Sequence, residues 1–235
     1  MKLLARLAEE PSRAAILLDV DGVLAPIVPR PEDARVPDEL RDELRRLCAR
    51  YALVACVSGR AGDDARSIVG VPELTYVGNH GLELEPAAEE WTARLESFLA
   101  AVDWPRTENK GLTASLHYRD APDEAAARRE LDEIAERARA AGLFARYGRK
   151  VLELVPPLEA SKGTAVRHLL ETRGLQRGLY AGDDTTDLDA FAALEGLEVG
   201  VRVAVASPEG PHALRERADI VLRSQHEVVG LLREL

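Results

Sequence analysis

The sequence lacks the features that mark several common classes of protein. No apolar stretch approaches the roughly 20 residues that a helix needs to cross a bilayer. The N-terminal segment, residues 1–10, is too charged for a signal peptide. The net charge of −10 argues against the basic face of a general nucleic-acid binder, although a local cluster of cations could still bind a small anion. We therefore expect neither a membrane nor a nucleic-acid partner.

Cysteine is also scarce, and its placement excludes another class. The chain has two cysteines, Cys48 in a helix-like segment and Cys56 in an apolar, strand-like one. Both are typical of buried thiols in a reducing compartment, and neither pattern favours a disulfide or a metal site. We expect a cytoplasmic protein, and we expect a monomer.

What the chain does contain is an apolar run that ends in two acids. Residues 16–18 are Ile-Leu-Leu, and Asp19, Asp21 and Gly22 follow at once. A strand with apolar residues on both faces is typical of the centre of a parallel sheet. Ligands bind at the carboxyl edge of such sheets, and two carboxylates so close together favour a cation such as Mg²⁺ between them. A polar turn chosen only for its geometry is the alternative.

Strands and helices alternate on both sides of a differently patterned middle segment. The apolar run at 53–57 indicates a second buried strand, and residues 75–77 and 178–182 indicate further strands, separated by helix-like segments. Residues 84–157 instead combine two amphipathic helices with alternating strands. The sequence therefore predicts an α/β fold: a Rossmann-like parallel-sheet core, residues 1–83 and 158–235, with an inserted smaller α+β domain, residues 84–157.

Polar groups follow four of the expected core strands. They are Asp19 with Asp21, Ser58, the Gly78–Gly81 turn, and Asp183 with Asp184. Lys162 begins a helix, where a cation is disfavoured unless an anion lies nearby. A carboxylate nucleophile, a second acid, metal-binding carboxylates, a hydroxyl and a cation together indicate phosphoryl transfer.

These motifs, in this order, resemble the haloacid dehalogenase-like phosphohydrolases. They are Asp-Val-Asp-Gly-Val at 19–23, Ser58, Lys162 and Gly-Asp-Asp at 182–184. The resemblance implies that Asp19 is the nucleophile, that Asp21 is the general acid/base, and that the insertion is a cap that selects the leaving group. It also implies Mg²⁺ held by Asp19, the Asp21 backbone carbonyl and Asp183, and phosphate bound by Ser58, Gly59 and Lys162. Val23 departs from the threonine common in that family, at a position we assign to packing.

Within that superfamily the sequence is similar to the trehalose-6-phosphate phosphatases. The similar pieces are Ser58-Gly59-Arg60, residues 78–83, Glu108-Asn109-Lys110, His117-Tyr118-Arg119, residues 148–153, and residues 182–187 with Phe191. The resemblance implies a sugar-phosphate substrate whose hydroxyls contact five side chains: Arg60, Glu108, Lys110, Arg149 and Glu153. Arg149 stands where a lysine is usual, which keeps the charge and changes the hydrogen-bond geometry.

Several other residues carry expectations of their own. We expect Asp184 and Asp187 to support the site, with Asp187 holding Lys162 or its loop. His80 is expected to be structural, and His117 to be either structural or substrate-facing. Two alternatives for the function stay open: a phosphatase of another sugar phosphate, such as glucosyl- or mannosyl-3-phosphoglycerate, and a non-catalytic sugar-phosphate binder.

Overall fold

The computed structural model describes residues 2–28, 30, 33–148, 150–207 and 210–235. The chain forms two compact units. The large unit comprises Met1–Gly81 and Ala160–Leu235, and the small unit comprises Leu82–Glu159. Each unit has its own sheet and its own apolar core.

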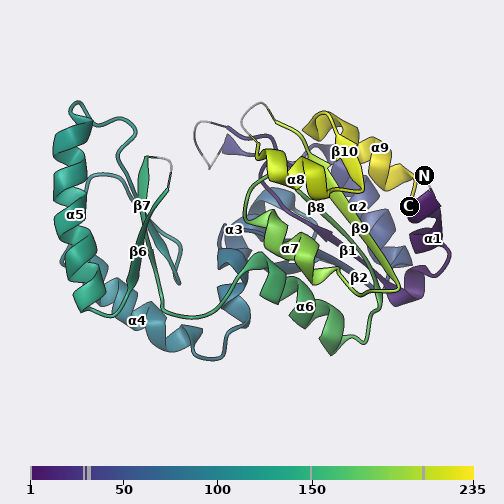
Figure 1. Cartoon of the computed structure of the whole chain (residues 1–235), viewed down its shortest axis with the longest axis horizontal. Coiled ribbons are helices and arrows are strands. Elements are labelled where there is room, and N and C mark those ends of the chain that lie inside the picture. Colours follow the sequence, from purple (N-terminus) through teal and green to yellow (C-terminus); the bar gives the residue numbers. More distant parts are fainter. Residues whose placement is uncertain (1, 29, 31–32, 149, 208–209) are drawn as a thin grey trace. The chain divides into compact units, whose positions relative to one another are not determined.

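A six-stranded parallel sheet forms the large unit, in the order β10-β9-β8-β1-β2-β3 (Figure 1). Its strands are β1 (Ala14–Leu18), β2 (Leu53–Val57), β3 (Thr75–Val77), β8 (Arg177–Gly182), β9 (Val199–Val205) and β10 (Ile220–Leu222). Because β1 lies between β8 and β2, the strand order reverses at β1. Reversal points of this kind are where open α/β sheets bind their ligands.

Helices cover both faces of this sheet (Figure 1). Leu7, Leu44 and Leu231, from three different helices, share one apolar cluster with Ile16 of β1. On the other face, Gly178 of β8 lies beside Leu170 and Leu194. The helices are α1 (Lys2–Ala8), α2 (Asp38–Arg50), α3 (Gly62–Val69), α6 (Lys162–Thr172), α7 (Asp187–Ala193), α8 (His212–Arg217) and α9 (Val228–Arg233). The α/β fold with a parallel sheet, predicted from the alternating pattern, is confirmed.

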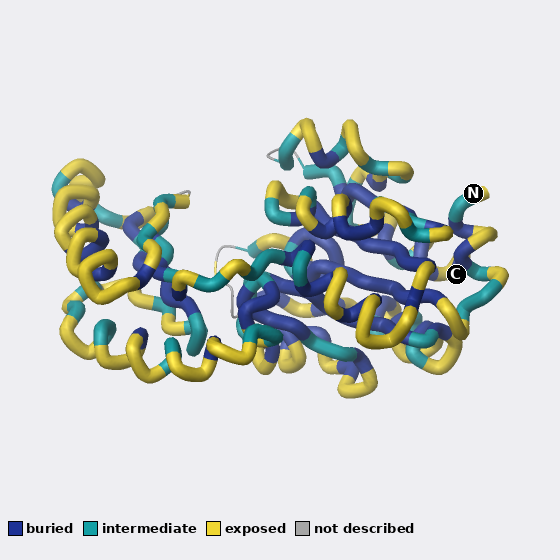
Figure 2. The backbone as a smooth tube through the Cα atoms, turned by 60° about the horizontal axis from the view of Figure 1, so that its bottom comes forward, coloured by how far each residue is buried: buried dark blue, intermediate teal, exposed yellow. Residues whose placement is uncertain are grey.

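The central strand is buried throughout, as its apolar sequence requires. All five residues of β1 are buried, and Figure 2 shows the strands of this sheet as the buried interior of the unit. Val23, just after the strand, is fully buried in the same core, which confirms its assignment to packing. Because β1, β2 and β8 pair in parallel, their carboxyl ends lie at one edge of the sheet, where Asp19, Ser58 and Asp183 follow.

The small unit is an antiparallel sheet backed by helices. Its order is β4-β5-β7-β6, and a separate antiparallel sheet was predicted from the alternating pattern. The elements are β4 (Thr107–Asn109), β5 (Ala114–His117), β6 (Phe144–Gly148), β7 (Val151–Val155), α4 (Ala88–Leu99) and α5 (Glu124–Ala140). Leu116 and Leu152 face the helices, and Trp91 and Phe98 of α4 pack against the same core, as expected. Among the described residues, none of the helices combines the length and apolarity that a membrane span requires.

Candidate active site

Asp19 lies at the end of the central strand and is held in place by backbone contacts. Its amide donates to the carbonyl of Ala181 at 2.9 Å, which extends the pairing of β1 with β8. Its Oδ1 accepts a 2.7 Å hydrogen bond from the amide of Val20, and the residue is 5% exposed. The other oxygen, Oδ2, points to Lys162. Asp19 is therefore a buried carboxylate with one fixed orientation.

Lys162 is the first residue of α6 and extends to this carboxylate. Ser161 caps the helix, and a reciprocal capping box with Thr164 fixes the start of the first turn. The Nζ of Lys162 lies 2.5 Å from Oδ2 of Asp19 and 2.8 Å from Oδ1 of Asp187. The two acids explain why a lysine is stable at a helix N-terminus, where a cation alone would be disfavoured.

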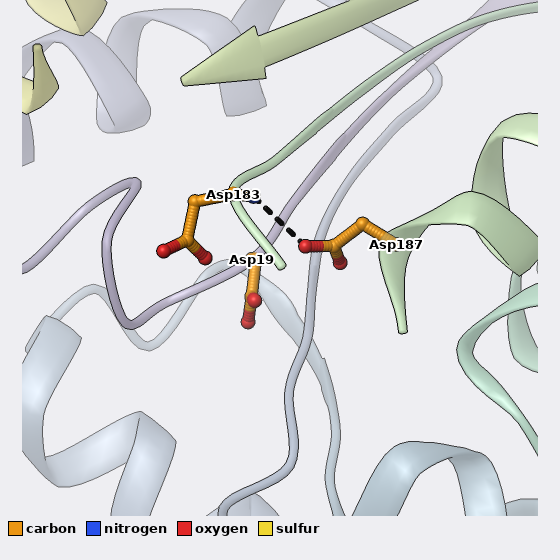
Figure 3. Close-up of side chains that lie close together, drawn as sticks. All are labelled: Asp19, Asp183 and Asp187. Carbon is orange, nitrogen blue, oxygen red and sulfur yellow. Dashed lines mark hydrogen bonds between the residues drawn. The ribbon is translucent and has the colours of Figure 1, made fainter. Parts of the chain in front are cut away.

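Asp187, the first residue of α7, organises the loop after β8. Its Oδ2 accepts a hydrogen bond from the amide of Asp183 at 2.8 Å (Figure 3). The amide of Asp184 donates to the same oxygen, also at 2.8 Å. Its Oδ1 accepts from Lys162 at 2.8 Å and from the hydroxyl of Tyr180 at 2.7 Å. Asp187 is fully buried, so these four donors satisfy a carboxylate that would otherwise be costly to bury. Asp187 was expected to hold Lys162 or its loop, and it contacts both. The side chain of Asp184, by contrast, is exposed.

Asp183 approaches the loop after β1 closely, and a glycine allows it. A Cβ at Gly22 would lie 2.1 Å from Oδ2 of Asp183, and Gly22 has a φ of +75°. Any side chain at that position would therefore push Asp183 away and strain the backbone. Asp19, Asp183 and Asp187 each place an oxygen within 4.8 Å of the others (Figure 3).

The crowding of acids shifts their protonation. Burial raises the pKa of Asp19 to about 7, despite the opposing effect of Lys162. Burial, with the charges of Asp19 and Asp187, raises the pKa of Asp183 to about 8. Burial works against the charge of Lys162, but Asp19 and Asp187 outweigh it and raise the lysine's pKa. Three buried carboxylates thus face one ammonium group, and a divalent cation would supply the missing positive charge.

The donor set identifies which acids fit such a cation. Both oxygens of Asp187 already accept hydrogen bonds from protein groups. Among the residues that the structure describes, the carboxylate of Asp183 makes no hydrogen bond, and Oδ2 of Asp19 accepts one from Lys162 only. The two aspartates that the resemblance implies as ligands, Asp19 and Asp183, are therefore the ones that fit a hard, oxygen-binding cation.

Ser58 and Gly59 directly follow β2, and Ser58 is hydrogen-bonded to β3 and to the turn after it. The amide of Ser58 donates to the carbonyl of Val77 at 2.9 Å, and the Ser58 carbonyl accepts from the amide of His80 at 2.9 Å. A Cβ at Gly59 would lie 2.7 Å from the imidazole of His80, so the ring packs directly on the glycine. Both Asn79 and His80 adopt left-handed backbone angles, with φ of 50° and 55°. His80 thus has the structural setting expected for it.

Asp21 and Arg60 form a bidentate ion pair, which the sequence did not suggest. Nε and Nη2 of Arg60 donate to the two oxygens of Asp21 at 2.6 and 2.8 Å. The remaining Nη1 donates to Asp64 of α3 at 2.9 Å. Arg60 was expected to contact substrate, but in this structure its guanidinium is engaged by two carboxylates of the chain.

Two of the residues expected to contact a sugar, Glu108 and Glu153, lie on the face of the small unit's sheet that points away from its helices. The strand register sets Glu108 opposite Ser115, Ser115 opposite Glu153, and Glu153 opposite Arg146, so these side chains share the face away from the helices. Glu108 accepts a contact from His117 at 3.1 Å and lies 3.8 Å from Nζ of Lys110. Glu153 pairs with Arg146 at 2.7 Å. Arg149 lies outside the described residues.

Two supporting residues were missed at the sequence level. Tyr180 sits in a buried strand and reads as an ordinary core residue, although a buried tyrosine hydroxyl needs a partner. Asp64 lies in the first turn of α3, four positions after Arg60, which precedes the helix. That spacing was the available signal for Asp64.

Known proteins share sequence with most of this chain. The family profile described as trehalose-phosphatase matches residues 17–219. A trehalose-phosphate phosphatase of Mycobacterium avium (strain 104) is 35% identical over 217 residues, which cover 81% of this chain and 54% of that protein. The chain spans between about half and about two thirds of the length of such curated relatives.

Solved structures match the fold over most of the chain. A trehalose-6-phosphate phosphatase related protein superimposes with a TM-score of 0.74 at 24% identity, covering 93% of this chain and 95% of that one. A haloacid dehalogenase-like hydrolase from Bacteroides thetaiotaomicron gives 0.62 at 16% identity, covering 94% and 98%. The predicted haloacid dehalogenase-like fold is thereby confirmed.

Proposed function

Because the chain belongs to the trehalose-phosphatase family, we propose that it is a phosphatase that hydrolyses trehalose 6-phosphate to trehalose and phosphate. The observation that carries the proposal is the buried pair formed by Asp19 and Lys162 at the carboxyl edge of the sheet. A non-catalytic binder of phosphate has no need for a carboxylate fixed in this way beside a cation.

The chemistry follows in two steps that use the same residues. In the first, Oδ of Asp19 attacks phosphorus, the bond from phosphorus to the sugar oxygen breaks, and Asp21 gives its proton to that oxygen. In the second, a water attacks the phosphorus of the aspartyl-phosphate and loses its proton to Asp21. Phosphate leaves, and the carboxylate of Asp19 is restored. The sum is the monoester plus water giving the alcohol plus phosphate.

The other residues bind charge and set positions. Lys162 and the Ser58–Gly59 turn are proposed to bind the phosphoryl oxygens. Asp19, Asp183 and the backbone carbonyl of Asp21 would hold Mg²⁺, which supplies positive charge against the phosphoryl oxygens when bound. Asp187 fixes Lys162 and the loop that carries Asp183.

We assign sugar recognition to the face of the small unit's sheet that points away from its helices. Glu108, Lys110 and Glu153 lie on or beside that face, and each can make several hydrogen bonds to hydroxyl groups. Arg149 is proposed for the same role. A site built for those hydroxyls rejects analogues that lack them, because its own polar groups are then left unpaired.

We also propose that the reaction takes place in the cytoplasm. Cys48 and Cys56 are both free thiols, which suits a reducing compartment.

The test is a phosphate-release panel over sugar phosphates with Mg²⁺ present. We expect the highest kcat/KM on trehalose 6-phosphate, and we expect Asp19→Asn to abolish turnover of every substrate while the protein stays folded. Equal or better activity on glucosyl- or mannosyl-3-phosphoglycerate would contradict the substrate assignment. Binding of trehalose 6-phosphate without release of phosphate would identify a binder and contradict the enzyme.

A further inference from the structure

Arg60 joins two acids that lie on different segments of the large unit. Its fork-shaped guanidinium meets both oxygens of Asp21, at 2.6 and 2.8 Å, and its third nitrogen meets Asp64 at 2.9 Å. The arginine side chain is 11% exposed, whereas Asp21 is 38% exposed and Asp64 is 50% exposed. A largely buried guanidinium therefore holds a half-exposed acid.

The backbone of Arg60 is anchored as firmly as its side chain. Its amide donates to Oγ of Ser58 at 3.2 Å, and its carbonyl accepts from the amide of Asn79 at 2.7 Å. Arg60 thus belongs to the same turn as the expected phosphate-binding residues. Because its backbone is held by these hydrogen bonds, its guanidinium can orient another group.

Asp21 depends on Arg60 more than the other acids of the site do. Asp19 is held by a backbone amide and by Lys162, and Asp187 is held by four donors. Asp21 is only partly buried, so without a partner its carboxylate would sample several side-chain rotamers. A bidentate arginine–carboxylate pair removes that freedom because it fixes both the position and the plane of the carboxylate.

The neighbouring acids keep the guanidinium of Arg60 positively charged. Burial of the guanidinium works against its charge, but the hydrogen bonds to Asp21 and Asp64 outweigh it and raise the pKa of Arg60. The arginine therefore stays cationic. Its charge also compensates the negative charge on Asp21 after the proton has passed to the leaving oxygen.

We propose that Arg60 is a positioning residue that orients the carboxyl group of Asp21 for proton transfer, and that Asp64 holds Arg60 in place. The proposal rests on the proposed function, because it takes Asp21 as the general acid and base. It differs from the role expected for Arg60 from the sequence, which was direct contact with the sugar.

The experiment compares two substrates that differ in their need for a proton. The leaving oxygen of trehalose 6-phosphate is a sugar hydroxyl that must be protonated, whereas p-nitrophenolate leaves p-nitrophenyl phosphate without a proton. Steady-state kinetics with Mg²⁺ are measured for wild type, Arg60→Gln and Arg60→Lys. Arg202→Gln is the matched control, because Arg202 makes a two-pronged pair with Asp219 in the same unit, with both contacts at 2.9 Å.

We expect Arg60→Gln to lower kcat on trehalose 6-phosphate by about 30- to 100-fold, within the range that misplaced general acid–base catalysis costs. The loss on p-nitrophenyl phosphate should be at least about ten times smaller, since proton transfer is a minor part of that reaction. KM should change little on either substrate. Arg60→Lys should recover only part of the loss, because an ammonium group cannot make the planar, bidentate contact.

A double variant tests whether Arg60 acts through Asp21. Arg60→Gln combined with Asp21→Asn should be no slower than Asp21→Asn alone, because the group that Arg60 orients is then absent. Additive losses would overturn the proposal. A raised KM on trehalose 6-phosphate with an unchanged kcat would show sugar contact and overturn it, and equal losses on both substrates would show a role at the phosphoryl group and overturn it too.

Two further outcomes separate this proposal from the proposed function. If wild type cleaves another alkyl phosphate but not trehalose 6-phosphate, the substrate assignment fails and the same comparison is made on that alkyl phosphate. If wild type cleaves no monoester, both fail.

If Arg60→Gln unfolds below the assay temperature, Asp64→Asn takes its place. Asp64→Asn should lower kcat more on the alkyl phosphate than on p-nitrophenyl phosphate. An equal loss of kcat on both substrates would overturn the proposal.

Discussion

The hydroxyl of Tyr180 donates a 2.7 Å hydrogen bond to Oδ1 of Asp187, and both side chains are fully buried. The same oxygen accepts from Lys162 at 2.8 Å. Tyr180 therefore fixes the carboxylate that in turn fixes the lysine beside Asp19. A residue in the middle of a buried strand thus reaches the candidate phosphate site through two hydrogen bonds.

Replacing Tyr180 with phenylalanine should weaken both the fold and the site. We expect Tyr180→Phe to lower the free energy of unfolding by about 1 to 2 kcal/mol, since a buried carboxylate loses one of its donors. Urea denaturation measures this loss, and kcat should fall at the same time because Lys162 is less well held. Tyr51→Phe is the control, since Tyr51 donates at 3.1 Å to the carbonyl of Leu235, a group outside the site. A change in kcat as large for Tyr51→Phe would contradict the link to Lys162.

This relationship shows where sequence-level prediction succeeds and where it stops. Asp19 could be predicted because an apolar run that ends in an acid places that acid at the sheet edge. An anionic partner for Lys162 could be predicted because a lysine at a helix start needs an anion. The contact between Tyr180 and Asp187 could not, because a tyrosine in a buried strand has the same pattern as any core residue.

The pairing of Arg60 with Asp21 was beyond the sequence for a different reason. The two residues are 39 positions apart, and their contact depends on the conformations of two loops. Strand β4 is not predictable from local pattern either, because its three residues, Thr-Glu-Asn, are polar and have low strand propensity apart from the threonine. Its pairing with β5 is a tertiary contact that local pattern does not encode.

Binding of Mg²⁺ should stabilise the protein more as the pH rises. Burial raises the pKa of Asp19 from 3.8 to about 7 and that of Asp183 from 3.8 to about 8. Without metal, the folded chain therefore binds more protons than the unfolded chain. The contribution of these acids to stability is present below pH 3.8 and is lost as the pH rises through about 7 to 8.

A divalent cation should reverse that loss, because it binds the ionised carboxylates. We expect the metal to add about 1.4 kcal/mol when its free concentration is about ten times the dissociation constant. Calorimetry with and without Mg²⁺ should show a larger rise in Tm at pH 8 than at pH 5. Asp183→Asn should remove this rise, and Asp184→Asn should keep it because the side chain of Asp184 is exposed. A rise of equal size at both pH values would argue against these ligands.

Glu153 offers a test of sugar recognition that separates it from chemistry. Glu153→Gln should raise KM for trehalose 6-phosphate by about tenfold or more, since a hydrogen bond to a charged group is worth about 1.5 to 3 kcal/mol. KM for p-nitrophenyl phosphate should stay nearly constant. The control is Glu136→Gln, which removes a comparable contact, 2.5 Å from Arg139, on α5 of the same unit. A matching rise in KM on both substrates would place Glu153 outside sugar recognition.

Gly182, the last residue of β8, leaves no room for a side chain beside Asp187. A Cβ at this position would lie 2.2 Å from Cγ of Asp187, and that carboxylate is held by Lys162 and by two backbone amides. Asp187 cannot withdraw without breaking those contacts. We therefore expect Gly182→Ala to cost about 1 to 3 kcal/mol of stability, the usual range for overpacking, and to lower kcat sharply.

Gly230→Ala in α9 is the matched control, because a Cβ there meets no atom within 4 Å. It should raise stability by up to about 1 kcal/mol through helix propensity and leave kcat unchanged. The measurements are urea denaturation and phosphate release, and full stability with full activity in Gly182→Ala would mean that Asp187 is free to move.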